Sequence, residues 1–232
     1  MAKKIYVSPS DQTKNTYAAG NTNEAIQCRK IATVLVAALK RCGFEAKTNL
    51  TASMADRVRE GNAWGADLYV AVHTNAFNEE VAGTRIFAID LVGEGYKAAK
   101  AVFAALAPVT PGTSENIKAR PELYEVRKSA SPCVYVEVDF HDVDEVAMWI
   151  IENTEEIAEA ICEGICNYFG VANTDNIPDD YATEAVEWAV ENGILKGDGT
   201  SYKLHSFVTR QDMLVFLYRA LNKMKNNSIE GE

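Results

Sequence analysis

The stretch that most constrains the fold of this chain is residues 67–75, which read DLYVAVHTN. It begins on a polar residue, runs through apolar and β-favouring residues, and ends on His73, Thr74 and Asn75. A short continuous apolar run of this kind indicates a strand buried on both faces of a helix-covered sheet. Because ligands of open α/β sheets bind outside the carboxyl ends of the strands, we expect His73 to lie at the edge of the sheet where a ligand binds.

Two further apolar runs end in polar groups. Residues 133–140 (CVYVEVDF) carry Glu137 and Asp139, which a regular strand would place on the same side. A carboxylate in so apolar a run is costly to bury unless it is paired or bound to a metal. Residues 3–8 form a first strand that leads to Asp11, and Glu24 opens the next helix. These groups can therefore converge on one site.

Strands and helices alternate along the first part of the chain. The patterns predict helices over residues 22–41, 53–65, 95–106 and 143–169, the last with a break near 152–153, and strands over 44–49, 84–89 and 123–126 besides those above. Residues 108–121, rich in proline, are expected to form a loop. This alternation predicts an α/β fold, a mostly parallel twisted sheet with helices on both faces.

The last quarter of the chain has a different pattern. A polar linker precedes one amphipathic helix over residues 181–192, a glycine-rich turn, and a second helix that Thr209 caps. The predicted division is an α/β domain over 1–170, a linker over 171–178, a small all-α unit over 179–224 and a polar tail over 225–232. A unit this small buries little surface, so we expect it to pack on the first domain or on a second copy of itself.

Composition excludes some classes of partner. The 232 residues carry a net charge of −10, which argues against nucleic acid and against an anionic membrane surface. The start of the chain leads straight into a strand, so we expect synthesis in the cytoplasm without a signal peptide. The five cysteines are expected to be reduced and buried; for Cys162 and Cys166, one helical turn apart, core packing is favoured over metal ligation by that pair alone.

The residue types at the predicted sheet edge fit a zinc hydrolase. Catalytic zinc takes three nitrogen or oxygen ligands and leaves one position open for water, whose proton a nearby carboxylate accepts. His73 is the best candidate ligand, and Glu137 is the candidate base. Glu24 has two readings: a metal ligand, or a residue that merely complements the dipole of its helix.

Residues 3–169 resemble the zinc-dependent N-acetylmuramoyl-L-alanine amidases of type 3, phage endolysins among them. The resemblance rests on the four segments 7–11, 21–24, 71–75 and 136–140. It implies a phosphorylase/hydrolase-like amidase fold, a Zn²⁺ cofactor and cleavage of the amide bond between N-acetylmuramic acid and L-alanine. It also implies that Glu24 and His73 are zinc ligands and that Glu137 is catalytic.

The first ligand departs from the family pattern. The histidine expected there falls on Asp11, or on Lys14 in the register of a phage-lysin subgroup. The site is therefore either Asp11, Glu24 and His73, or Glu24 and His73 completed by water or another group. In the runner-up interpretation, the loss of this histidine has left a catalytically impaired cell-wall-binding protein. Asn75 and Arg85 are candidate substrate contacts, although Asn75 can simply cap its strand and Arg85 can simply be solvated.

Three segments of the last part, residues 182–194, 197–199 and 207–213, resemble one surface-layer-homology repeat. The resemblance implies binding to cell-wall polymers, normally by three such repeats together. With one copy, either chains associate, giving a homodimer, or the repeat packs on the catalytic domain; a hairpin that only dimerises or stabilises the protein is an equal alternative. We expect a phage- or prophage-type endolysin that acts at the bacterial cell wall, with peptidoglycan and a secondary wall polymer as partners.

Overall fold

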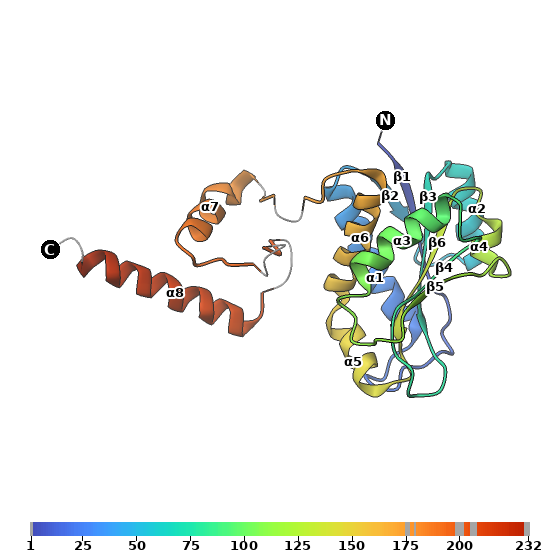
Figure 1. Cartoon of the computed structure of the whole chain (residues 1–232), viewed down its shortest axis with the longest axis horizontal. Coiled ribbons are helices and arrows are strands. Elements are labelled where there is room, and N and C mark those ends of the chain that lie inside the picture. The colour runs from blue at the N-terminus through green and yellow to red at the C-terminus, as the bar shows by residue number, and fades with distance from the viewer. Residues whose placement is uncertain (1, 175–176, 179, 198–201, 205–207, 230–232) are drawn as a thin grey trace. The chain divides into compact units, whose positions relative to one another are not determined.

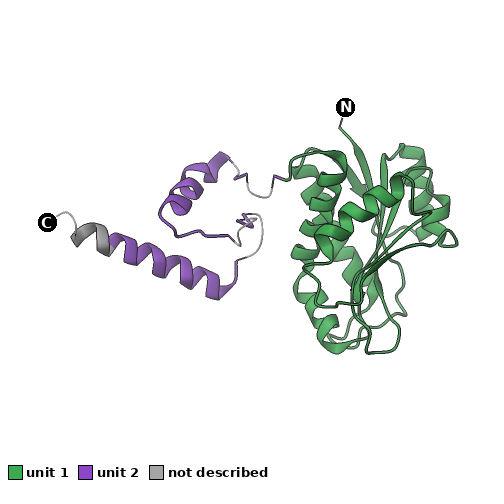
Figure 2. Ribbon diagram, viewed as in Figure 1, with its two compact units in different colours: residues 1–173 green, residues 174–232 purple. Residues whose placement is uncertain are grey.

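The protein is represented by a computed structural model that describes residues 2–174, 177–178, 180–197, 202–204 and 208–229 (Figure 1). It divides into two compact units, Met1–Asn173 and Thr174–Glu232 (Figure 2). Three residues of the predicted surface-layer-homology pattern, Asp198, Gly199 and Phe207, lie outside the described residues.

The first unit is built on a six-stranded sheet in the order β2-β1-β3-β6-β4-β5. The strands are β1 (Lys4–Pro9), β2 (Glu45–Thr48), β3 (Leu68–Asn75), β4 (Arg85–Ala88), β5 (Asn116–Ala119) and β6 (Cys133–Phe140). All neighbours pair in parallel except β4 and β6, which are antiparallel. The predicted fold class, a mostly parallel sheet flanked by helices, is confirmed.

Helices cover both faces of this sheet. The helices are α1 (Glu24–Arg41), α2 (Met54–Trp64), α3 (Glu94–Leu106), α4 (Tyr124–Lys128), α5 (Asp144–Glu152) and α6 (Thr154–Phe169). In Figure 1, α1, α3 and α6 lie on one side of the sheet and α2 and α4 on the other. The larger hydrophobic cluster joins Val70 and Val72 of β3 to the first group, and the smaller one joins Tyr69 and Tyr135 to the second. Successive residues of each strand thus serve opposite layers.

Side chains at the helix ends explain where the first two helices begin and end. Asn23 accepts a hydrogen bond from the Ile26 N–H, and Ser53 accepts one from the Asp56 N–H, so both are N-caps. Gly65, with φ of 69°, ends α2 in the left-handed conformation that glycine adopts without strain. The cap at residue 23 thus fixes where α1 begins, at Glu24.

Two local predictions were wrong. Residues 123–126 were predicted to form a strand, but Tyr124–Lys128 is the helix α4, whose Val126 is buried in the smaller cluster. Packing against that layer overrides the local β-propensity of the segment. The segment 108–121 was predicted to be a loop, yet it contains the edge strand β5. The predicted break near 152–153 is confirmed, because α5 ends at Glu152 and α6 begins at Thr154.

The second unit contains a 3₁₀ turn (Asp180–Ala182) and the helices α7 (Thr183–Glu191) and α8 (Arg210–Ile229). The backbone of α8 runs through residues 225–229, which were predicted to belong to a tail. Many apolar side chains of this unit are exposed, among them Trp188 at 49% and Leu217 at 53%. Among the helices of the described part of the chain, none is long and apolar enough to cross a membrane.

Candidate active site at the carboxyl edge of the sheet

The ends of β3 and β6 bring two of the predicted site residues onto adjacent strands. His73 lies opposite Glu137 in the parallel register of the two strands. The register then shifts, so that Asn75 pairs with Phe140. Glu24, the first residue of α1, reaches the same edge and contacts His73. The structure thus brings Glu24 and His73 into contact and places Glu137 beside them.

His73 is held between two carboxylates. Its Nδ1 lies 2.9 Å from Oε1 of Glu24, and its Nε2 lies 3.0 Å from Oε2 of Glu125. The imidazole is only 4% exposed and stacks on the ring of Tyr135 at a centroid distance of 4.3 Å. Both ring nitrogens are therefore engaged, and the orientation of the ring is fixed on three sides.

Polar neighbours hold the carboxylate of Glu24. The amide of Asn15 donates to its Oε2 at 2.7 Å, and the amide of Gln12 donates to its Oε1 at 3.5 Å. Burial acts to raise the pKa of Glu24, but the hydrogen bonds with His73, Ser10 and Asn15 outweigh it and lower that pKa. Glu24 is therefore a buried carboxylate that is kept ionised.

A second polar network holds Glu125 on the other side of the imidazole. Its Oε1 accepts hydrogen bonds from the hydroxyls of Ser8 at 2.6 Å and Tyr69 at 3.0 Å. Ser8 in turn accepts a hydrogen bond from Nε of Arg57, a guanidinium that is only 1% exposed. The end of β1, the start of β3 and the helices α2 and α4 thus converge on one carboxylate.

The two carboxylates change the acid–base behaviour of His73. Burial opposes a charge on the imidazole, but the hydrogen bonds to Glu125 and Glu24 and the negative charges nearby raise its pKa to about 10. In the absence of a metal ion, His73 is therefore a cation held between the carboxyl groups of Glu24 and Glu125. A metal ion at Nδ1 would take the place of the proton that faces Glu24.

Glu137 is buried in a different way. Its Oε2 has no hydrogen-bond partner within the residues that the structure describes. Burial, as the largest cause, raises its pKa to about 8, and the charge of His73 opposes that rise. An unpaired buried carboxyl oxygen beside a histidine is expensive unless a ligand, water or substrate uses it.

The remaining candidates for the first metal ligand lie elsewhere. Oδ2 of Asp11 accepts the backbone N–H of Met54 at 2.8 Å and lies 3.7 Å from Nη2 of Arg57, so Asp11 serves the start of α2. Lys14 is exposed. Within the described ranges, one group of three or more potential ligands has all its ligand atoms within 4.8 Å of one another, and it consists of cysteines. The structure therefore does not bring Asp11 to Glu24 and His73.

The donor set at this edge fits a divalent cation held by two protein ligands. Oε1 of Glu24 and Nδ1 of His73 are 2.9 Å apart, and two ligands that each lie about 2 Å from one tetrahedral zinc ion are roughly 3.3 Å apart, so a small outward movement of either side chain would admit the ion. The carboxylate is ionised, and Glu125 engages the far nitrogen of the ring, as carboxylates do behind metal-binding histidines. Water or substrate would have to supply the other positions.

The two predicted substrate contacts, Asn75 and Arg85, line one pocket of about 470 Å³. Its wall also includes the cations Lys118 and Arg120. The Arg85 guanidinium donates to the Ser114 hydroxyl at 2.9 Å and lies over the ring of Phe140 at 5.3 Å. Because Arg85 pairs with Glu137 across β4 and β6, this basic pocket adjoins the candidate base.

Asp139 has a structural role distinct from that of Glu137. Its carboxylate accepts the backbone N–H groups of Gly83 at 2.6 Å and Gly112 at 3.1 Å. A side chain at either glycine would collide with the other segment, since a Cβ on Gly112 would lie 2.0 Å from the Gly83 nitrogen. Asp139 therefore joins the two segments that precede β4 and β5, whose residues line the pocket.

Sequence reasoning missed Glu125, Arg57 and Tyr69. For Glu125 the sequence offers one weak signal, a carboxylate among Leu123, Tyr124 and Val126, and the strand predicted there obscured it. Arg57 reads as an ordinary helix cation. Its burial is visible only once α2 is placed against the sheet.

Comparisons with known proteins agree with this fold. The family model described as N-acetylmuramoyl-L-alanine amidase matches residues 5–167, and the S-layer homology domain model matches residues 174–214. The chain belongs to the N-acetylmuramoyl-L-alanine amidase family. An uncharacterized protein of Clostridium perfringens (strain 13 / Type A) is 25% identical over 209 residues, which are 85% of this chain and 59% of that protein. The chain thus spans about three fifths of the length of this curated relative.

Solved structures share the fold of the first unit. The catalytic domain of CwlV, an amidase from Bacillus (Paenibacillus) polymyxa, matches with a TM-score of 0.66 and 17% identity, covering 73% of this chain and 99% of that one. An N-acetylmuramoyl-L-alanine amidase of Nostoc punctiforme matches at 0.65 and 22% identity, covering 72% and 97%. The catalytic domain of an endolysin that targets Clostridia Difficile matches at 0.61 and 23% identity, covering 71% and 97%.

Proposed function

We propose that this chain hydrolyses the amide bond between N-acetylmuramic acid and L-alanine in peptidoglycan. The observation that carries the proposal is the contact of 2.9 Å between His73 and Glu24 beside the unpaired buried oxygen of Glu137. Family membership supports the same reaction class. The proposal does not include the predicted ligand set of Asp11, Glu24 and His73.

Zn²⁺ is the proposed cofactor, with Nδ1 of His73 and Oε1 of Glu24 as its protein ligands. When bound, zinc would polarise the scissile carbonyl group and make a water molecule more acidic. Glu125 would hold His73 in the orientation that presents Nδ1. Asn15 and Gln12 would hold Glu24 in place through their amide groups.

Glu137 is the proposed general base and acid. Its Oε2 is buried and has no hydrogen-bond partner in the described part of the chain, so it can accept the proton of the attacking water. The same carboxyl group can then give that proton to the leaving amine of L-alanine. Its raised pKa, about 8 in the metal-free protein, favours a group that both accepts and releases a proton near neutral pH.

The basic pocket is the proposed site for the peptide part of the substrate. Arg85, Lys118 and Arg120 present positive charge along one wall, and the peptide stems of peptidoglycan carry carboxylates. Phe77 and Phe140 supply apolar surface in the same pocket. Such a lining suits a ligand in which a negatively charged peptide lies next to a neutral glycan.

The test is the release of new amino termini from purified bacterial peptidoglycan by the zinc-supplemented chain. Wild type should release amino-terminal L-alanine, and Glu137→Gln should reduce the rate by about 10²–10⁴-fold. Glu45→Gln, which changes an exposed carboxylate of β2, is the matched control and should retain the wild-type rate.

A wild-type chain that binds walls but releases no amine, with or without added zinc, would refute the hydrolase proposal. That result would favour the runner-up, a catalytically impaired wall-binding protein. Release of amine at equal rates by wild type and Glu137→Gln would instead refute the role of Glu137.

Residues 174–214 are proposed to attach the protein to a secondary cell-wall polymer, in line with the S-layer homology match. The exposed apolar side chains of α8, such as Leu214 at 65% and Leu221 at 58%, support a surface that is covered in use. Walls stripped of secondary polymer should bind the full chain much less than untreated walls. The homodimer predicted through this unit finds no support in the comparisons. The proposed place of action is the bacterial cell wall.

A further inference from the structure

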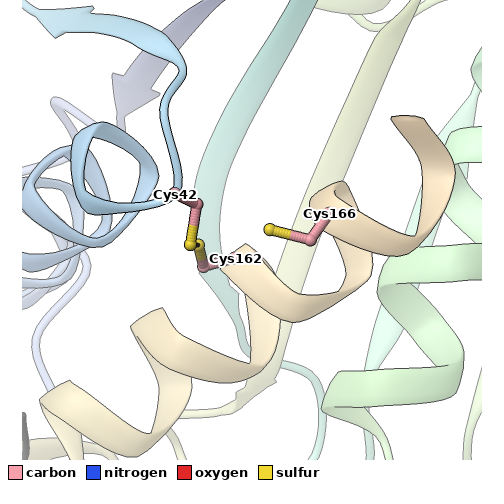
Figure 3. Close-up of side chains that lie close together, drawn as sticks. All are labelled: Cys42, Cys162 and Cys166. Atoms are coloured by element: carbon pink, nitrogen blue, oxygen red, sulfur yellow. Dashed lines mark hydrogen bonds between the residues drawn. The ribbon is translucent and has the colours of Figure 1, made fainter. Parts of the chain in front are cut away.

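Three buried thiols from two distant parts of the chain lie close together. Cys42 follows the last residue of α1, and Cys162 and Cys166 lie one turn apart on α6 (Figure 3). Their exposures are 6%, 0% and 0%. The sulfur atoms of the three residues all lie within 4.8 Å of one another. Core packing by a pair of helix cysteines does not by itself predict that a third thiol should join them.

The spacing of the sulfur atoms is that of ligands to one ion. The Sγ atoms of Cys42 and Cys162 are 3.8 Å apart. Two thiolates on one tetrahedral zinc ion, each about 2.3 Å from the metal, are also about 3.8 Å apart. Figure 3 shows the side chain of Cys166 directed toward the other two sulfur atoms.

The surroundings can complete such a site. The carboxamide oxygen Oδ1 of Asn173 lies 3.6 Å from Sγ of Cys42 and can serve as an oxygen ligand or hold a water molecule. Arg41, the neighbour of Cys42, is bound to Glu159 of α6 by two hydrogen bonds of 3.0 and 2.6 Å. This pair holds the end of α1, where Cys42 lies, against the helix that carries Cys162 and Cys166.

We propose that Cys42, Cys162 and Cys166 form a second metal site, which binds one Zn²⁺ or a cation of the same thiol-preferring class. Soft thiolates select such ions, whereas carboxylate and imidazole groups, as at the sheet edge, do not demand them. On binding, each thiol loses its proton to solvent, and the two positive charges of the ion offset part of the three negative charges.

The site would have a structural function. It would join the end of α1 to α6 and to the segment just after α6, which leads out of the first unit at Asn173. Buried, sulfur-rich ligand sets are typical of structural zinc, and the oxygen of Asn173 would close the fourth position of this one. The inference is independent of the proposed amidase reaction, because its site shares no residue with the edge of the sheet.

To test the proposal, the full chain is reduced, freed of metals and titrated with Cd²⁺. The measurement follows the ultraviolet charge-transfer band of thiolate-bound cadmium. Wild type should develop the band and saturate at one ion per chain. Cys162→Ala should bind more weakly by over about 100-fold, because a lost ligand costs more than the 10–100-fold of an outer-shell partner. The matched control is Cys133→Ala, which removes a buried thiol of β6 and should retain the band.

A second measurement on wild type does not depend on how a variant folds. X-ray absorption at the cadmium edge, with one equivalent bound, should show sulfur atoms around the ion. Oxygen and nitrogen scatterers alone would overturn the proposal. Equal loss of the band in Cys133→Ala and Cys162→Ala would also overturn it, whatever the result of the amidase assay.

Discussion

Nε2 of His73 and Oε2 of Glu125 are 3.0 Å apart, and this contact links the end of β3 to a helix of only five residues. It sets which nitrogen of the imidazole faces Glu24. A carboxylate behind a metal-binding histidine fixes the ring and raises its basicity. Glu125 is therefore a positioning residue for the proposed zinc ligand.

Replacing Glu125 by glutamine should weaken zinc binding by about 10–100-fold, the usual effect of losing such a carboxylate. Calorimetric titration of the metal-free chain measures this affinity. Arg127→Gln changes an exposed side chain of the same helix and should leave the affinity as it is. Unchanged affinity in Glu125→Gln would mean that the contact does not position His73.

Asp11→Ala should lower the free energy of unfolding by about 1 kcal/mol, because Asp11 accepts the Met54 N–H at the first turn of α2. Its zinc affinity should match that of wild type. Denaturant unfolding and metal titration measure the two quantities, with the exposed neighbour Thr13→Ala as control. A loss of zinc binding as large as in His73→Ala would instead make Asp11 a ligand.

The metal-free protein should lose stability as the pH rises. Burial raises the pKa of Glu137 from 4.5 to about 8, and the flanking carboxylates raise that of His73 from 6.5 to about 10. Both groups bind protons more tightly in the folded state than in the unfolded state. Each therefore stabilises the fold fully below its ordinary pKa of 4.5 or 6.5, and this stabilisation is lost as the pH rises to its raised pKa of about 8 or about 10. The Tm of chelator-treated protein should therefore fall between about pH 5 and about pH 10.

Glu137→Gln separates the two contributions. It should remove the part of the decline that begins near the ordinary carboxyl pKa and leave the part that ends near the raised pKa of His73, about 10. The exposed variant Glu45→Gln should keep the whole decline. An unaltered dependence of Tm on pH in Glu137→Gln would show that folding does not raise the pKa of this carboxyl group.

Gly164→Ala should destabilise the first unit by about 1–3 kcal/mol or more, the usual cost of overpacking a core. A Cβ at this position of α6 would lie 2.4 Å from Cα of Val102 in α3, so the two helices would have to separate. Glu163→Ala, on the exposed side of α6, should be nearly neutral. A similar small change in both variants would argue against the close helix contact.

The sequence could predict the elements whose pattern and neighbours agree. The apolar runs of β3 and β6, and the capped starts of α1 and α2, encode their structure locally, and these placed His73, Glu137 and Glu24. The roles of these three residues, and of Asn75 and Arg85, remain predictions.

What the sequence could not predict depends on contacts between distant segments. Tyr124–Lys128 is helical because Val126 packs into the smaller cluster, and the position of Glu125 follows from that helix. Asp11 follows β1 in sequence, yet the N-terminus of α2, some forty residues later, determines its partner at 2.8 Å. The gathering of Cys42 with Cys162 depends likewise on how α1 meets α6.

The bonds from Asp139 to Gly83 and Gly112 have a consequence for how this protein can diversify. They hold the two backbone segments beside the pocket through a buried side chain that does not line the pocket. Arg85, Lys118 and Arg120 can then be exchanged for other residues while the frame that carries them stays in place. A different ligand could then be recognised by changing only that lining.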